Sequence, residues 1–230
     1  NSCETNSNSP AAGGAIFCYR SNGQILLSNF TDNFLNIIKD DTGSYGGAIA
    51  LRYSFFNFIQ CYFVNNYILQ NDASSNGGAI MMFLSNGTFS NCIFMENNAT
   101  LAVGGALVIL NGICIFEKCS FINNNAYGGD DIFIQFSNTD FCIEIRNCTF
   151  QKDNFLRGNM RSLLYFNYYA SSSSYLNVFI NNQLIINELN KLVIFDGYLA
   201  NSVYNFWYFR NNCLFPYDES FYKGNNFNLI

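Results

Sequence analysis

The feature that most constrains this chain is a Gly-Gly-Ala-(Ile/Leu) block that recurs at a fixed distance before a Phe-x-x-Asn motif. The first glycine and the phenylalanine are 17 residues apart in four copies, which run from Gly13 to Phe30, Gly46 to Phe63, Gly77 to Phe94 and Gly104 to Phe121. The distance between copies varies. A constant segment within a variable period is typical of a solenoid, because the packed part of each turn keeps its length whereas its outer loop does not.

The Phe-x-x-(Asn/Asp) motif extends this repeat over nearly the whole chain. Its phenylalanines are Phe30, Phe63, Phe94, Phe121, Phe150, Phe179 and Phe209. The sequence therefore predicts an all-β fold, a parallel β-helix of about seven coils of about 30 residues. Right-handed coils are expected, because crossovers between parallel strands are right-handed. A leucine-rich repeat is the structural competitor, but its leucine and asparagine spacing is missing.

Two further columns accompany the phenylalanines. Residues two apart in a strand share a face, so the cysteines two positions before the phenylalanine are predicted to point into the core, namely Cys61, Cys92, Cys119 and Cys148. Each strand then ends at a bend marked by Asn33, Asn66, Asn97, Asn124, Asn182 and Asn212, with Asp153 in the fifth coil. Amides stacked about 4.8 Å apart can form hydrogen bonds to one another along the axis.

The repeat sets the expected domain organisation. We expect residues 1–12 to form an N-terminal segment or cap, residues 13–214 to form the β-helix, and residues 215–230 to form a C-terminal segment or cap. The first residues carry neither the basic segment nor the apolar stretch of a signal peptide, and no apolar run is long enough for a transmembrane helix. We interpret the chain as a processed or partial product.

Composition narrows the set of partners. The formal net charge is −5, there is no histidine, and no basic stripe is available to neutralise phosphates, so nucleic acid is not expected as a partner. Half of the residues are apolar and only 12% are charged, which is typical of an ordered chain with a large core. Zinc is also disfavoured, since no Cys-x-x-Cys motif exists.

The cysteines allow two interpretations. The four column cysteines can pack as a ladder of small hydrophobic side chains. Alternatively, neighbouring rungs lie within the Cα distance that a disulfide requires, which would indicate an oxidising compartment. Outside the column, Cys114 with Cys142 and Cys3 with Cys18 are the candidate disulfide pairs.

An acidic segment is the one candidate for chemistry. Parallel β-helices often carry enzymes that cleave acidic polysaccharides with paired carboxylates. Here Asp130, Asp131 and Asp140 occur in an order unlike that of polygalacturonases, and the histidine of their Gly-His-Gly element is absent. Together with Glu144 and Arg146 they could hold calcium for a lyase reaction. We expect neither enzymatic activity nor a cofactor. Calcium binding by these residues is one alternative, and another is that Asp130 and Asp131 are simply solvated residues at a coil bend.

Two features concern the outer surface. Asn-x-(Ser/Thr) sequons make Asn29, Asn86, Asn98 and Asn147 candidate N-glycosylation sites, although chance alone gives about as many in so asparagine-rich a chain. The strand after each glycine pair is apolar on both faces, which indicates that its outer face is covered. The candidate interface residues on that face are Phe17, Ala50, Met81 and Val108. The cover could be the chain's own loops or tail, or another protein.

The pairing of Gly-Gly-Ala-Ile with Phe-x-x-Asn over residues 13–127 resembles the passenger region of chlamydial polymorphic outer membrane proteins and related β-helical surface proteins. This resemblance implies an extracellular or surface-exposed solenoid used in adhesion. The membrane-embedded C-terminal barrel of those proteins is missing here. We therefore expect a cell-surface or extracellular adhesive or filament-forming scaffold that associates with itself, with other surface proteins or with glycans. The alternative is a carbohydrate-active or carbohydrate-binding β-helix.

Overall fold

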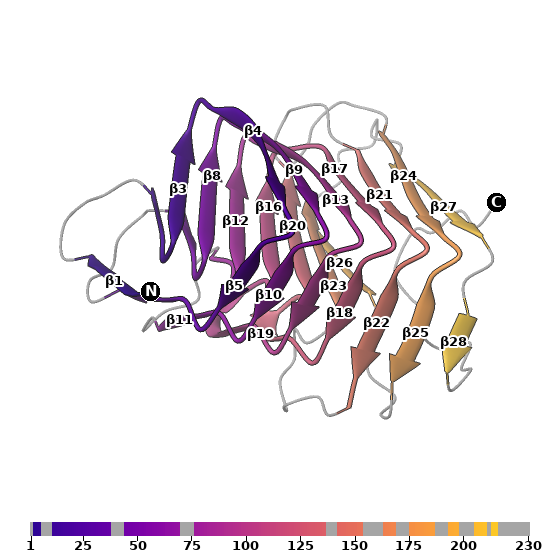
Figure 1. The fold of residues 1–230 in the computed structure, drawn as a ribbon. Helices are drawn as coiled ribbons and strands as arrows, with labels where there is room; N and C mark the ends of the chain where they lie inside the picture. Colours follow the sequence, from indigo (N-terminus) through magenta and orange to yellow (C-terminus); the bar gives the residue numbers. More distant parts are fainter. Residues whose placement is uncertain are drawn as a thin grey trace.

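The computed structural model describes residues 2–5, 11–37, 44–69, 76–136, 142–153, 163–168, 175–186, 193–197, 205–210 and 213–215. In these residues the chain is all-β, and parallel strands stack coil upon coil as a β-solenoid (Figure 1). The predicted parallel β-helix class is confirmed. Where helices are concerned, the described part of the chain contains none with the length and hydropathy to cross a bilayer.

Three sheets of seven parallel strands make the walls of the solenoid. Sheet I consists of β3 (Ile16–Tyr19), β8 (Ile49–Arg52), β12 (Ile80–Phe83), β16 (Leu107–Leu110), β20 (Ile132–Phe136), β23 (Leu164–Tyr168) and β26 (Val193–Gly197). Sheet II consists of β4 (Asn22–Leu26), β9 (Phe55–Ile59), β13 (Asn86–Ser90), β17 (Cys114–Glu117), β21 (Ile143–Arg146), β24 (Tyr175–Ile180) and β27 (Asn205–Arg210). Sheet III consists of β5 (Asn29–Thr31), β10 (Tyr62–Val64), β14 (Ile93–Met95), β18 (Ser120–Ile122), β22 (Thr149–Lys152), β25 (Gln183–Ile186) and β28 (Cys213–Phe215).

Two smaller sheets complete the described coils. Sheet IV consists of β1 (Ser2–Thr5), β6 (Phe34–Ile37), β11 (Tyr67–Leu69), β15 (Asn98–Val103) and β19 (Asn125–Gly128), and a further pair joins β2 (Ala11–Gly13) to β7 (Ser44–Gly46). Residues 2–5, which we expected in an N-terminal segment or cap, therefore add a strand to the solenoid. The other predicted end segment lies outside the described residues, apart from its first residue, Phe215.

The coils turn at corners where one residue has a positive φ. These residues are Arg20, Tyr53, Leu84 and Asn111 after sheet I, Leu27, Gln60, Asn91, Lys118, Asn147 and Asn181 after sheet II, and Asp32, Asn65, Glu96 and Asn123 after sheet III. A single left-handed residue redirects the strand without breaking the stack. Corner amides donate to the next coil, as Asp32 N does to Val64 O at 3.1 Å, so the bends leave these donors satisfied.

The glycine pairs allow neighbouring coils to approach closely. A Cβ on Gly47 would lie 2.0 Å from the carbonyl oxygen of Gly78, and a Cβ on Gly78 would lie 2.1 Å from that of Gly105. Both distances are far below van der Waals contact, so a side chain at either position would push the coils apart. This close approach explains why the Gly-Gly-Ala block recurs unchanged.

The phenylalanine column is confirmed over five coils. Phe30, Phe63, Phe94, Phe121 and Phe150 occupy equivalent positions in sheet III. Successive ring centroids are 5.0, 4.9, 4.9 and 4.8 Å apart, and the rings are nearly parallel. Stacked rings of this kind contribute about 0.5–1.5 kcal/mol per pair beyond burial.

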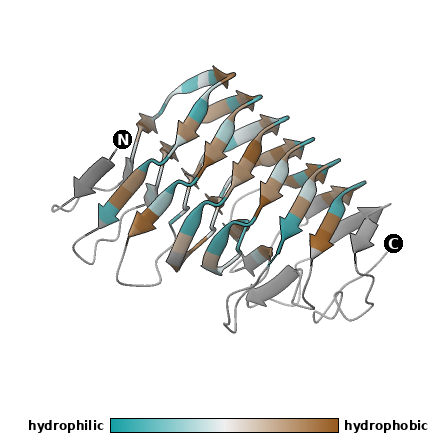
Figure 2. Cartoon of the chain, turned by 60° about the horizontal axis from the view of Figure 1, so that its bottom comes forward, coloured by the Kyte–Doolittle hydropathy of each residue, from teal (hydrophilic) through white to brown (hydrophobic). Residues whose placement is uncertain are grey.

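A second aromatic stack fills the facing side of the core. Phe58, Phe89 and Phe116 of sheet II stack at 4.7 and 4.8 Å. Each meets the first stack edge-on, as Phe89 does with Phe94 at 5.8 Å. The core therefore contains a pair of interlocked aromatic columns. Figure 2 shows that hydrophobic segments of the strands repeat from coil to coil.

The predicted phenylalanine column is wrong in its last two members. Phe150 pairs with Leu184 in sheet III, whereas Phe179 pairs with Ile145 and with Phe209 in sheet II. Phe179 and Phe209 therefore continue the column of sheet II. The core position in sheet III accepts a large apolar side chain, and Leu184 replaces phenylalanine there. The Phe-x-x-Asn motif therefore no longer marks the sheet III strand in this coil.

The asparagine column forms an amide ladder of four residues, Asn33, Asn66, Asn97 and Asn124. Each side-chain Nδ2 donates to the Oδ1 of the next residue, at 2.9 Å in all three steps. The same Oδ1 also accepts from the backbone N–H of the preceding ladder residue, as Asn97 Oδ1 does from Asn66 N at 3.0 Å. These side-chain amides therefore form hydrogen bonds both with backbone groups at the bend and with one another.

The predicted ladder does not continue beyond its fourth residue. Asp153 contacts Asn123 instead of Asn124, and the adjacent Lys152 is buried in its place. Asn182 lies in the cysteine column, where its Oδ1 accepts from Cys148 N at 2.8 Å. Asn212 is outside the described residues. The regular solenoid comprises about four turns, and the seven equivalent coils are not confirmed, although sheets I to III each contain seven strands.

Candidate functional site

The predicted interface on the outer face of sheet I is mostly covered within the chain. Ala50, Met81 and Val108 are at most 1% exposed and pack in a cluster that includes Val103 of β15. The apolar pattern correctly indicated a covered face, but these three side chains cannot contact a second protein while the cover is in place. Of the four candidates only Phe17 is exposed, at 47%.

Exposed apolar side chains gather instead around the first coils. They include Phe17, Tyr19, Leu26, Leu27, Tyr53 and Phe55. The strands β3, β4 and β5 are the end strands of sheets I, II and III, so each pairs with a neighbour on one side only among the described strands. This end of the solenoid thus combines unpaired strand edges with partly exposed apolar side chains.

The backbone hydrogen bonds identify which groups of β4 face outward. Phe55 N donates to Ser21 O and Leu27 N donates to Ile59 O, so the odd-numbered residues of this segment bond to β9. In a parallel ladder the backbone N–H and C=O groups of successive residues point alternately to one neighbouring strand and to the opposite side. The N–H and C=O of Gln24 and Leu26 are therefore directed away from β9, toward the open edge.

An aromatic ridge runs along the corner after sheet I. Tyr19, Tyr53 and Phe83 meet edge-on at 5.8 and 6.0 Å. The guanidinium groups of Arg20 and Arg52 lie 5.2–6.0 Å from these ring centroids. The ridge presents cation–π pairs on the surface, which are suited to contacts with a partner protein.

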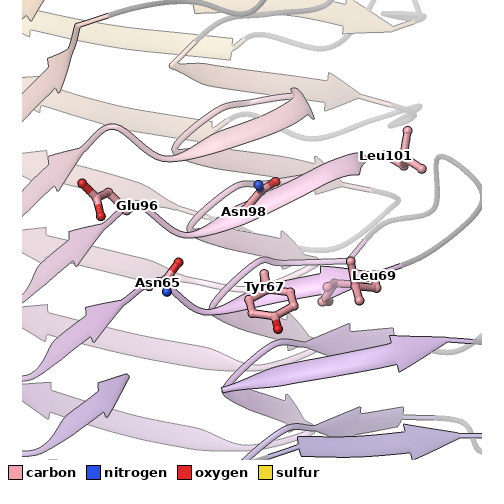
Figure 3. A pocket seen from close by; sticks show the side chains of 7 residues that line it. Asn65, Tyr67, Leu69, Glu96, Asn98 and Leu101 are labelled. Atoms are coloured by element: carbon pink, nitrogen blue, oxygen red, sulfur yellow. The ribbon is translucent and has the colours of Figure 1, made fainter. Parts of the chain in front are cut away.

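A groove of about 380 Å³ lies on the outer side of β11 and β15 (Figure 3). Tyr67 stacks on Phe34 of the preceding coil at 5.2 Å. The residues that line the groove are Asn65, Tyr67, Ile68, Leu69, Glu96, Asn98 and Leu101. An aromatic ring beside amide and carboxylate groups provides a stacking surface together with hydrogen-bond donors and acceptors. We did not predict this groove, although the residue after each ladder asparagine could have indicated it.

A buried charged cluster, here called the acidic junction, lies where the amide ladder ends. It consists of Asp130, Asp131 and Lys152, all at most 1% exposed. Asn124 Nδ2 donates to Asp131 Oδ1 at 2.8 Å, and Lys152 Nζ lies 3.5 Å from Asp130 Oδ2. The aspartates are therefore part of the core, and our alternative of solvated residues at a bend is wrong.

Burial dominates the electrostatics of this junction. It raises the pKa of Asp131 to about 7, although Lys152 and the hydrogen bond from Asn124 oppose the shift. Asp131 Oδ2 has no hydrogen-bond partner among the described residues, so the carboxylate form is poorly solvated. Asp131 occupies the column position of Ala106, because Ala106 N donates to Asp131 O at 3.1 Å.

The residues considered for polysaccharide cleavage do not meet at one surface. Asp130 and Asp131 are inside the core, whereas Glu144 and Arg146 form an ion pair of 2.8 Å on β21 with both side chains partly exposed. Asp140 is outside the described residues. Among the residues with described positions, no group of three acidic or cysteine side chains could hold a metal ion.

The column cysteines are free thiols that donate to backbone carbonyls. Cys61 Sγ lies 3.2 Å from Ile25 O and Cys119 Sγ lies 3.3 Å from Phe89 O. Burial raises the pKa of Cys119 well above its usual value, while the Cys119 thiol lowers that of Cys92 by hydrogen bonding. No disulfide forms among the cysteines whose side chains are described, so the disulfide interpretation is not supported for Cys18, Cys61, Cys92, Cys114, Cys119, Cys142 and Cys148.

The sequons differ in accessibility. Asn29, Asn86 and Asn147 are exposed, and a glycan at any of them would extend into solvent. Asn98 is half-buried in the groove beside Tyr67. A glycan on Asn98 would therefore fill the groove.

Comparison of the chain with family models, curated proteins and solved structures found no match.

Proposed function

We propose that this chain is an extracellular or cell-surface structural protein that acts as an adhesive or filament-forming scaffold. The observation that carries the proposal is the open end of the solenoid, where the edges of β3, β4 and β5 coincide with exposed Phe17, Leu26 and Leu27. Unpaired parallel edges bind further strands readily, and proteins that remain monomeric usually block them. Neither charge nor proline blocks β4 here, since it reads Asn-Gly-Gln-Ile-Leu.

The interior supports a mechanical role. Two aromatic stacks and the amide ladder run along the axis, so each coil is held to its neighbours by rings, amides and strand hydrogen bonds. Each coil contacts only adjacent coils, and a further coil from another copy could add to the end by the same interactions. We also propose right-handed coils, seven in number, on the basis of the crossover preference and the seven-stranded sheets.

Association can be tested by blocking the outward backbone of β4. In Gln24→Pro the N–H that points to the open edge is removed, while the bonds to β9 are kept. We expect the wild-type chain to form concentration-dependent oligomers or rods in sedimentation and electron microscopy, and Gln24→Pro to remain monomeric. Gln24→Ala is the matched control and should associate like the wild type. Equal association of all three proteins would reject this contact.

The groove favours a second candidate function, the binding of a glycan without cleavage. Sugar rings pack on aromatic faces and form hydrogen bonds with amides and carboxylates, which Tyr67, Asn65 and Glu96 would supply. We expect Tyr67→Ala to abolish retention on immobilised polysaccharides. Tyr62→Ala removes a tyrosine that is 45% exposed on β10, outside the groove, and should have no effect. Turnover of a polysaccharide by the wild type would contradict a purely binding role.

A further inference from the structure

The acidic junction places an amine against a side-chain amide of the neighbouring coil. Lys152 ends β22, and its Nζ donates to the backbone oxygen of Asn124 and to Asn125 Oδ1, the latter at 2.8 Å. The amide carbon Cγ of Asn125 is one bond beyond that oxygen. The nitrogen and the carbon are thus close to the separation from which an amine attacks a carbonyl group.

The surroundings supply a proton acceptor. Asp130 Oδ2 lies 3.5 Å from the same Nζ, and Asp130 Oδ1 is fixed by the N–H of Ala126 at 2.9 Å. Lys152, Asp130 and Asp131 are almost fully buried, and burial disfavours the separated charges of ammonium and carboxylate. Transfer of a proton from Nζ to Asp130 leaves a neutral amine, which is a nucleophile.

We propose that Lys152 and Asn125 form an intramolecular amide bond that links two adjacent coils covalently. The Nζ lone pair attacks Asn125 Cγ, the Nζ–Cγ bond forms, and the Cγ–Nδ2 bond breaks. Nζ loses two protons in this reaction. Asp130 takes the first from the ammonium group and passes it to the leaving nitrogen, then takes the second as the new amide forms and gives it to the departing ammonia, which leaves as ammonium. No oxidant, metal or other reactant is consumed.

The two possible electrophiles differ in position. Asn125 is closer to Nζ than Asp130 is, and it is only half-buried, so ammonia can leave to solvent. Asp130 is fully buried and better placed to carry the proton than to be consumed. Asn125 is therefore the acceptor, and Asp130 assists the transfer.

The bond would lie where the amide ladder ends. Asn124 is the last amide of the ladder, and the link would join Asn125 of β19 to Lys152 at the end of β22 in the following coil. The link would thus replace the missing amide contact between these coils. Such a bond would prevent the coils from separating under load, whatever partner the protein has.

Intact-mass spectrometry of the folded full chain tests the proposal. We expect a mass lower than the sequence mass by one ammonia, together with a branched proteolytic peptide in which Lys152 is joined to Asn125. Chain isolated and kept in denaturant should have the full sequence mass and lose ammonia only after refolding. The full mass in the folded protein after prolonged incubation would overturn the proposal.

Two controls separate this reaction from others. Asn-Gly sequences such as Asn22-Gly23 and Asn86-Gly87 can also lose ammonia by forming a cyclic imide. That loss would persist in Lys152→Met and give no branched peptide, and such a result would overturn the proposal. Asn125→Ala should retain the full mass and still fold, because it keeps the pair of Lys152 with Asp130. Loss of water with a Lys152–Asp130 link would also overturn it.

Discussion

The amide ladder and the acidic junction are neighbours in the core, yet they satisfy buried polar groups by different chemistry. In the ladder one neutral residue type both donates and accepts, so the same contact repeats from Asn33 to Asn124. At the junction Asp131 Oδ1 accepts from Asn124, but its second oxygen, Oδ2, makes no onward hydrogen bond among the described residues. A buried amide column can therefore repeat, whereas a carboxylate ends it and requires a cation such as Lys152 nearby.

The largest effect is expected inside the ladder. Asn97→Ala removes the acceptor of Asn66 and the donor to Phe63 O and Asn124 Oδ1, and leaves several buried groups unsatisfied. Since each such group costs about 1–3 kcal/mol, we expect the free energy of unfolding to fall by about 5 kcal/mol. Chemical denaturation measures it. The exposed Asn22→Ala is the control, and an equally small change for both variants would show that the ladder is not stabilising.

At the junction the expected effect is a dependence of stability on pH. The folded state holds a proton on Asp131 up to a pKa of about 7, whereas the unfolded chain loses it near 3.8. The folded state thus binds more protons between these values, so its stability is greatest near pH 4 and falls as the pH rises to 7. The loss is about 4 kcal/mol, since each pKa unit corresponds to about 1.4 kcal/mol.

Asp131→Asn isolates this contribution. The amide keeps an acceptor for Asn124 and cannot titrate, so its stability should lack the decline between pH 4 and 7. Burial is the largest cause of the raised pKa, and the decline is expected whether or not Lys152 keeps its charge. Parallel pH profiles for the wild type and Asp131→Asn would contradict the assignment.

The regular coils could be predicted from sequence because spacing alone defines them. Phe63, Phe94 and Phe121 follow their glycine pairs at a constant distance, and this fixed the register of the core. At the junction the block reads Gly-Gly-Asp-Asp, with one extra residue and an acid at the position of alanine. We considered Asp130 and Asp131 only as residues for cleavage or calcium binding or as solvated residues at a bend, but an acid in a core column was the signal of a buried charged site.

The frame error in the later coils has a simple physical cause. The sheet III position requires volume and apolarity, and Leu184 supplies both as well as a phenylalanine does. The motif Phe179-x-x-Asn182 then arose by chance in an asparagine-rich chain. The residue after each ladder asparagine was the one sequence signal for the Tyr67 groove, but the shape of the groove depends on which loops and strands leave side chains exposed, and the repeat does not define this.

A smaller effect is expected at the first ladder residue. The Asn33 side chain donates to Asn66 Oδ1. Among the described residues, no group of an earlier coil donates to Asn33 Oδ1. Asn33→Ala should therefore reduce the free energy of unfolding by about 1 kcal/mol, the net value of one hydrogen bond. A loss as large as that of Asn97→Ala would mean that the ladder responds as one unit, not rung by rung.

The smallest effect is expected at the exposed ion pair of the fifth coil. Glu144 and Arg146 approach to 2.8 Å, whereas Lys152 and Asp130 are 3.5 Å apart, so distance alone would rank the exposed pair higher. The Arg146 and Glu144 side chains are 46% and 25% exposed, and water already solvates much of their charge. Glu144→Gln should therefore lower stability by about 0.5 kcal/mol, and the difference should vanish in high salt. Denaturation at two salt concentrations measures it, and a salt-independent loss of several kcal/mol would show that burial does not separate the two pairs.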